Sequence, residues 1–148
     1  MRVMIKIKKL HENAKLPVQA KKGSAGYDVH ACFGGDFDLC VIPPRDHLLI
    51  PTGIAIQVPE GYELQVRPRS GLALKCGVTV LNSPGTIDHG YLDEIGVILV
   101  NHSDQSYIVH DGDRIAQLVL KPVLEMEFEE TESFEGYDRE GGFGSSGN

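Results

Sequence analysis

The sequence lacks the features that mark secreted, membrane and zinc-binding proteins. Its three cysteines, Cys32, Cys40 and Cys76, are scattered and show no Cys-x-x-Cys spacing, which indicates reduced thiols. No apolar run approaches the length of a membrane crossing. Residues 1–10 alternate apolar residues with lysine, unlike the apolar centre of a secretory signal. We therefore expect an intracellular, cytoplasmic protein with no membrane partner.

An excess of basic charge is also absent. The formal net charge is −7, and residues 125–140 are strongly acidic, with Arg139 as their one basic residue. Without this segment the formal charges balance. A neutral body with an acidic tail lacks the basic face that nucleic-acid binding requires, so we expect no nucleic-acid partner. The 148 residues, 41% hydrophobic and 24% charged, are typical of one folded domain.

Long helical periodicity and internal repeats are missing as well. Short apolar or alternating runs are separated by proline and glycine turns, which predicts an all-β sandwich or barrel. The expected strands are residues 3–7, 39–42, 46–52, 54–58, 62–66, 78–81, 95–100, 107–109 and 115–120. One exception is residues 70–75, where Ser70 precedes an apolar run that is compatible with a single helical turn.

Residues 82–94 concentrate polar chemistry between two aliphatic strands. Pro84, Gly85 and Gly90 predict a tight turn there, with Asp88 and Tyr91 at its rim. Taken alone, this stretch is an ordinary surface turn in which Asp is a turn former. A carboxylate and an aromatic ring three residues apart also suit a ligand site.

Two further segments carry groups that suit a phosphate. Arg67, Arg69, Ser70 and Gly71 precede the expected helical turn, and free backbone N–H groups and guanidiniums bind phosphate. A capped turn with surface arginines explains the same residues. Gln117 is polar within an apolar strand, and either core amides or a ligand would satisfy it.

The remaining chemistry lies near the two ends. Gly26, close to Asp28 in a short strand, suits a close backbone approach. A turn or hydrogen-bonding role explains Asp28 on its own. Residues 141–147 contain four glycines around Phe143, too costly in ordering entropy for a core element. They are either a disordered tail or an arm that orders over a ligand, with Phe143 stacking on a base.

Five segments, in order, resemble the five motifs of the trimeric deoxyuridine triphosphate nucleotidohydrolases (dUTPases). They are residues 25–31, 69–73, 82–91, 112–118 and 139–147. The resemblance implies an all-β fold, a distorted jelly roll or β-barrel, assembled as a homotrimer with three active sites at subunit contacts. Residues 1–124 would form the core. Residues 125–148 would form an acidic linker and a flexible glycine-rich arm that closes a neighbouring subunit's active site.

The implied reaction is hydrolysis of dUTP to dUMP and diphosphate with Mg²⁺, in which water attacks the α-phosphorus. It would keep uracil out of DNA and supply dUMP for thymidylate synthesis. Asp88 would be the catalytic base that orients and deprotonates the water. Asp28 would lie near the Mg²⁺ and contact it through water, since the phosphates and waters supply most ligands.

The resemblance also implies a substrate-binding set. Tyr91 would lie under the sugar and leave no room for a 2′-hydroxyl, and the hairpin backbone with Gly96 would read the uracil edge. The predicted set is Arg69, Ser70, Gly71, Asn82, Thr86, Ile87, Asp88, Tyr91, Gly96, Gln117, Arg139, Phe143, Gly144 and Ser145.

Two positions depart from the family pattern. Leu92 and Asp93 stand where the family usually has Arg-Gly, so any role of that arginine is lost. Arg139 precedes Phe143 by four residues, not the usual five, which leaves its phosphate contact open.

Other readings share the fold. The dCTP deaminases need a Glu base for ring chemistry, and a non-catalytic, nucleotide-sensing regulator would bind without hydrolysis. A capsid-type jelly roll is a more distant, structural alternative. Asp88, Tyr91 and Phe143 favour the hydrolase.

Overall fold

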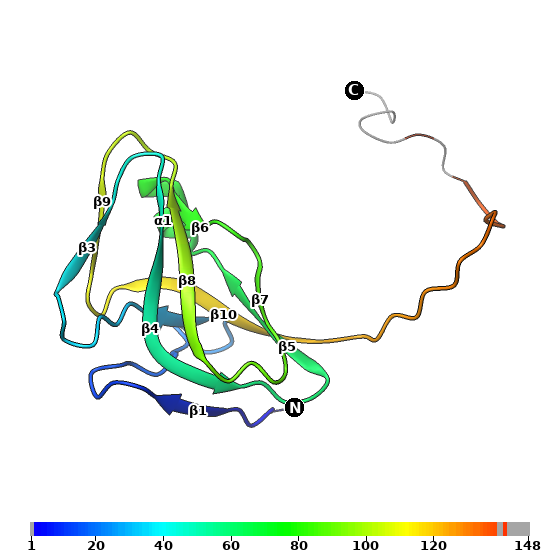
Figure 1. The fold of residues 1–148 in the computed structure, drawn as a ribbon, viewed down its shortest axis with the longest axis horizontal. Helices are drawn as coiled ribbons and strands as arrows, with labels where there is room; N and C mark the ends of the chain where they lie inside the picture. Colours follow the sequence, from blue (N-terminus) through cyan, green and yellow to red (C-terminus); the bar gives the residue numbers. More distant parts are fainter. Residues whose placement is uncertain (1, 139–140, 142–148) are drawn as a thin grey trace.

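Within residues 2–138 and 141, which the computed structural model describes, three antiparallel sheets and one short helix form the body (Figure 1). The first sheet has the strand order β1-β4-β8-β6, the second β2-β10-β5-β7, and the third pairs β3 with β9. The elements are β1 (Lys6–Lys9), β2 (Tyr27–His30), β3 (Leu39–Ile42), β4 (His47–Gln57), β5 (Tyr62–Arg67), α1 (Ser70–Cys76), β6 (Val78–Val80), β7 (Gly85–Ile87), β8 (Glu94–Asn101), β9 (Tyr107–His110) and β10 (Arg114–Pro122). The all-β prediction is confirmed.

One cluster of buried aliphatic side chains joins the two four-stranded sheets. In β8, Ile95, Val97 and Leu99 are buried and point to one face, as the two-residue period of a strand requires. Val29 of β2 and Ile115 of β10 are equally inaccessible. Each such side chain contributes about 1.5–3 kcal/mol by its burial, and the described residues of this cluster all precede the acidic tail.

The predicted break at Gly53 is wrong, because β4 runs through it. Gly53 has φ +65°, and the pairing of β4 with β8 shifts register between Pro51 and Ala55. Its N–H leaves the ladder and donates to the Glu94 carboxylate at 2.7 Å. The glycine therefore makes a β-bulge inside one long strand instead of a turn between two.

The structure adds a strand that the sequence did not predict. β6 and β8 pair with each other, as predicted for the two strands that flank residues 82–94, but the connection between them is not the predicted single tight turn. Between them, β7 crosses to the second sheet and pairs with β5. A Cβ at Gly85 would lie 3.2 Å from the Val66 Cβ atom, so the close fit of β7 on β5 depends on this glycine. A three-residue strand that contains glycine carries too weak a pattern for recognition from sequence.

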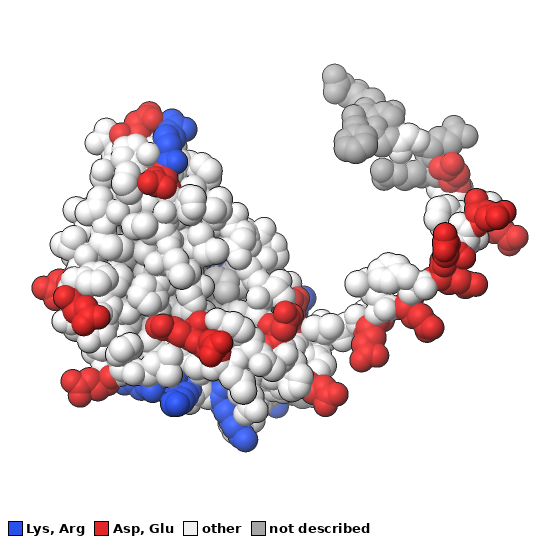
Figure 2. All heavy atoms as spheres, in the orientation of Figure 1, with Lys and Arg blue, Asp and Glu red and all other residues white. Residues whose placement is uncertain are grey.

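After β10 the chain leaves the body. Residues 123–138 contain no helix or strand and are exposed, and they extend away from the sheets in Figure 1. Figure 2 shows their acidic side chains along the whole segment. The predicted division of the chain at residue 124 stays a prediction, although β10 ends at Pro122, close to it. In the described part of the chain, no helix has the length and apolar character needed to span a membrane.

Candidate active site

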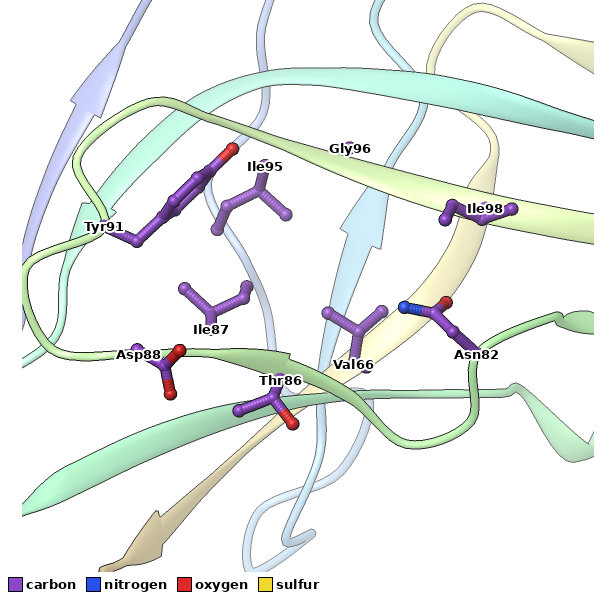
Figure 3. A pocket seen from close by; sticks show the side chains of 10 residues that line it. Val66, Asn82, Thr86, Ile87, Asp88, Tyr91, Ile95, Gly96 and Ile98 are labelled. Carbon is purple, nitrogen blue, oxygen red and sulfur yellow. The ribbon is translucent and has the colours of Figure 1, made fainter.

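A pocket of about 250 Å³ lies between β7 and the start of β8 (Figure 3). Tyr91 and Asp88 lie at one end of it, and Asn82 and Ile98 at the other. The lining residues are Val66, Asn82, Gly85, Thr86, Ile87, Asp88, Tyr91, Ile95, Gly96 and Ile98. The structure therefore brings together the predicted residues of the 82–94 stretch and Gly96. Its volume suits a base and sugar better than a whole nucleoside triphosphate.

Three apolar lining residues were not predicted. Val66, Ile95 and Ile98 supply hydrophobic wall around the polar rim. Ile98 stands two residues beyond Gly96, so strand periodicity places both on one face and offered a usable signal. Val66 comes from β5, and only the unpredicted pairing of β5 with β7 brings it here.

The Asp88 carboxylate is exposed, and no hydrogen bond or ion pair joins it to any residue within 2–138 and 141. Its backbone carbonyl accepts the Tyr91 N–H at 3.2 Å, which closes a turn with Gly90 at φ +90°. That φ is the reason for a glycine at the third position of this turn. The carboxylate is thus presented to solvent by its backbone alone, free to accept a proton or orient water.

Tyr91 is fixed by its hydroxyl. The phenol O–H donates to the Glu94 carbonyl at 2.8 Å, and the Glu94 carboxylate in turn accepts the Gly53 N–H. Tyr91 as a whole is 41% exposed, and its ring lies at the edge of the pocket. Leu92, which replaces the usual arginine of this motif, is 61% exposed.

A second hollow of about 520 Å³ lies on another side of the 82–88 segment. Gln65, Arg67, Pro68, Ser70, Ser83, Pro84 and Gln117 line it. Ser70 is the first residue of α1 and does not cap it, because Arg69 occupies the N-cap without a side-chain hydrogen bond. Gly71 is exposed beside it, and a Cβ there would meet nothing within 4 Å. None of the residues that the structure describes lines both hollows.

Next to this hollow, Asp28 lies between two guanidiniums. Arg69 Nε approaches one carboxylate oxygen at 3.3 Å, and Arg114 Nη1 approaches the other at 3.3 Å. The Asp28 side chain is only 10% exposed. Arg69 Nη1 also donates to the Arg114 carbonyl at 3.2 Å. The carboxylate therefore neutralises and orients two cations. Arg114 was not predicted, since the pairing of β2 with β10 that brings it to Asp28 is not readable from sequence.

Gln117 is held by two close contacts. Its amide Nε2 donates to the Pro68 carbonyl at 2.9 Å. Its Oε1 lies against Gly26, where a Cβ atom would overlap it. Because residue 26 is glycine, the Gln117 side chain can lie directly against its backbone. This is the close backbone approach that the sequence predicted at Gly26.

Comparisons with known proteins show which family the chain belongs to. Residues 12–147 match the family model dUTPase. The deoxyuridine 5'-triphosphate nucleotidohydrolase of Hydrogenobaculum sp. (strain Y04AAS1) is 56% identical over 142 residues, which are 95% of this chain and 96% of that protein. The chain belongs to the dUTPase family.

Solved dUTPases share the fold. A mutant dUTPase of Staphylococcus bacteriophage 80alpha, solved with dUpNHpp, has a TM-score of 0.83 at 30% identity, covering 97% of this chain and 98% of that one. The dUTPase of phage phi11 of S. aureus, in a structure that describes the coordination of a structural Mg(II) ion, has a TM-score of 0.77 at 26% identity, covering 90% and 100%. The resemblance drawn from five motifs is confirmed.

The dUTPase resemblance implies Mg²⁺, but the described side chains do not form a site for it. No group of three or more His, Cys, Asp or Glu residues within 2–138 and 141 is placed to hold a metal ion. Both Asp28 oxygens face guanidiniums, which disfavours direct ligation. A contact of Asp28 with the metal through water stays a prediction.

Part of the predicted dUTPase site lies outside the described residues. These are the residues of the arm, Arg139, Phe143, Gly144 and Ser145. Their predicted contacts with phosphate and base stay predictions.

Proposed function

We propose that this protein hydrolyses dUTP to dUMP and diphosphate, and that Asp88 orients and deprotonates the water that attacks the α-phosphorus. Its family and the name of its Hydrogenobaculum relative support the reaction. The proposed role of Asp88 rests on one observation. Its carboxylate is exposed and has no partner among the described residues, at one end of the pocket between β7 and β8 (the hairpin pocket). A general base must be within reach of the water it activates, and this carboxylate has nothing to compete for it among the described residues.

The hairpin pocket is the proposed site of uracil and deoxyribose. Backbone groups of residues 82–88 and Gly96 would read the base edge, and the apolar wall of Val66, Ile95 and Ile98 would exclude water around it. Tyr91, held by its hydroxyl, would present its ring face to the sugar. A 2′-hydroxyl would then meet carbon where it needs a hydrogen-bond partner.

The second hollow and the adjacent arginines are the proposed triphosphate site. Ser70, Gly71 and Gln117 would donate to phosphate oxygens, and Arg69 would add a guanidinium already oriented by Asp28. Fixed donors of this kind stabilise charge that develops in the transition state. Mg²⁺ would be held by triphosphate oxygens and water, the ligands it prefers, and Asp28 would lie outside direct coordination.

The division between two hollows supports a homotrimer. Among the described residues, Asp88 and Ser70 line different hollows with no lining residue in common, an arrangement that lets one dUTP draw its base site and its phosphate site from different subunits. The exposed apolar residues that follow β10 also support a homotrimer. Leu124, Met126 and Phe128 alternate with glutamates and are 85%, 77% and 86% exposed, the pattern of a strand that still needs cover. A closed ring would give each site equivalent parts.

Release of diphosphate from dUTP, dCTP, dTTP and UTP tests the proposed reaction. We expect release from dUTP alone among the four at equal concentration. Release of ammonia from dCTP would instead identify a deaminase, and binding of dUTP without release would identify a sensor.

Tyr91→Ala tests sugar selection in the same assay, and we expect its dUTP-to-UTP preference, as a ratio of kcat/KM, to fall.

The trimer and the arm are tested by mixing two inactive variants. One chain ends before Gly141, and the other carries Asp88→Asn. After joint unfolding and refolding, a mixed trimer can place an intact arm over a site with an intact Asp88, so activity should return. Exchange without recovery, or a fully active monomer in light scattering, would contradict the shared site.

A further inference from the structure

The Asp88 side chain is positioned only through its backbone. No described residue contacts its carboxylate by a hydrogen bond or an ion pair. On its N-terminal side, Ile87 is fixed by pairing with Leu64 of β5. On its C-terminal side, the chain enters the exposed turn that ends at Tyr91. Whatever holds this turn therefore sets where the carboxylate points.

His89 ties that turn to the core. Its Nδ1 lies 2.8 Å from the Val58 carbonyl oxygen, and since a carbonyl can only accept, Nδ1 carries the proton. Val58 is fully buried and follows β4 directly, before the turn that Tyr62 N–H closes on the Pro59 carbonyl at 3.2 Å. The anchor point is therefore a rigid part of the body, 31 residues away in sequence.

The position of His89 in the turn makes this bond matter. His89 is the second residue and Gly90, at φ +90°, the third. Glycine leaves the turn open to other backbone conformations, and the single turn bond from the Tyr91 N–H, at 3.2 Å, is a weak restraint on an exposed segment. The His89 bond supplies a second restraint, directed to the buried residue that follows β4.

We infer that His89 is a positioning residue for catalysis: its Nδ1–H, donated to Val58, holds the turn so that the Asp88 carboxylate meets the attacking water. This inference rests on the proposed role of Asp88. It assigns His89 no contact with substrate and no proton transfer of its own. A displacement of about 1 Å at a catalytic group can cost up to about 10²-fold in rate, so a loose turn should lower kcat while the preformed pocket keeps KM nearly unchanged.

Three substitutions separate the donor from the ring. Asn places its amide nitrogen near the position of Nδ1 and can donate to Val58, whereas Gln places its amide one bond further out, and Ala has no donor. We expect His89→Ala and His89→Gln to lower kcat about 10-fold or more, with KM for dUTP changed less than about 3-fold. His89→Asn should restore most of kcat. Thermal melting checks that all variants are folded at the assay temperature, and the Asn and Gln pair alone decides the matter if Ala does not fold.

Three results would overturn the inference. Wild-type kcat in folded His89→Ala would show that the bond does not matter. An Asn variant as slow as the Ala variant would show that the imidazole itself takes part. A shift of the acidic limb of the kcat–pH profile in His89→Asn would show that the charge of the ring acts on Asp88.

A double variant distinguishes failure of this inference from failure of the proposed role of Asp88. In the Asp88→Asn background, adding His89→Ala should change the residual rate less than about 2-fold, because the positioned group is already gone. A full further loss would overturn the positioning role. If Asp88→Asn alone keeps wild-type turnover, the proposed role of Asp88 fails instead.

Discussion

Asp88 and Asp28 are carboxylates in opposite surroundings. Asp88 is exposed, unpaired within the described residues and held by its backbone, whereas Asp28 is nearly buried between the guanidiniums of Arg69 and Arg114. Each also has a histidine nearby. His89 hydrogen-bonds to Val58, whereas buried His30 has an Nδ1 with no partner in the described chain. The carboxylate of the proposed base is left free, and the carboxylate that orients two arginines is enclosed by them.

The largest effect should follow from Asp88→Asn, which removes the proposed base without removing any contact seen in the structure. Turnover of dUTP should fall by at least ~10², while dUTP binding, followed by calorimetry, and the melting temperature stay at wild-type values. Turnover at the wild-type rate in this variant would show that the free carboxylate of Asp88 is not the catalytic base.

Gly26→Ala tests the surroundings of Asp28, because Gly26 contacts Gln117, which pairs with Asp28 across β10 and β2. The new methyl group would overlap the Gln117 amide oxygen, and the side chain would rotate away from the Pro68 carbonyl. One lost hydrogen bond costs about 0.5–1.5 kcal/mol of stability. The Gln117 amide would no longer face the proposed phosphate site, so KM for dUTP should rise about 10-fold, equivalent to ~1.4 kcal/mol. An unchanged KM would place Gln117 outside the phosphate site.

Asp28→Asn, unlike Asp88→Asn, should lower the free energy of unfolding. It leaves two guanidiniums without a counter-charge, so urea denaturation should show a loss of about 1–3 kcal/mol. The surface exposure of Arg114 keeps the cost below that of a fully buried pair. KM should rise severalfold as Arg69 loses its orientation, with kcat affected less. Equal stability of the two Asn variants would contradict the contrast between the two carboxylates.

The smallest effect concerns His30 and pH. Burial, followed by the charge of Lys15, lowers the pKa of His30 below 6.5; Arg114 and Arg69 act in the same direction, and Asp28 opposes them. Below pH 6.5 the unfolded chain therefore binds a proton that the folded chain does not. Stability is lost as pH falls from about 6.5 toward the folded pKa. His30→Gln should lose less stability than wild type between pH 7 and pH 5.5 in urea denaturation. Parallel losses would show that other groups carry the pH dependence.

Sequence patterns anticipated the strands better than the way they pair. Residues 39–42 form β3 as expected, and the alternation of Val3, Ile5 and Ile7 with exposed neighbours is present. These patterns are local, since they depend on which face of a single strand is buried. The bulge at Gly53 and the crossing strand β7 depend on partners in other strands. Both Gly53 and Gly85 predict turns when only the sequence is considered. In the structure, Gly53 forms a bulge and Gly85 allows a close contact between β7 and β5.

The same limit applies to the site. The structure gathers Asn82, Thr86, Ile87, Asp88, Tyr91 and Gly96 around one pocket, because most of them belong to one short stretch. Arg114 and Val66 escaped notice, since their neighbours at the site come from distant strands. The anchoring of His89 is equally hidden, because nothing in the sequence relates a turn histidine to the carbonyl of Val58.

The topology of the Asp28 cluster has a consequence for how the chain is made. Asp28 and Arg114 are 86 residues apart in sequence, and β2 pairs with β10, the last strand of the body to be synthesised. Until residues 114–122 have left the ribosome, β2 lacks that partner strand and Asp28 lacks the Arg114 guanidinium. Pairings of this range are slow to form, and an unpaired strand is exposed to wrong partners while it waits. A chain interrupted before β10 therefore holds the whole Asp88 turn but not the assembled arginine cluster.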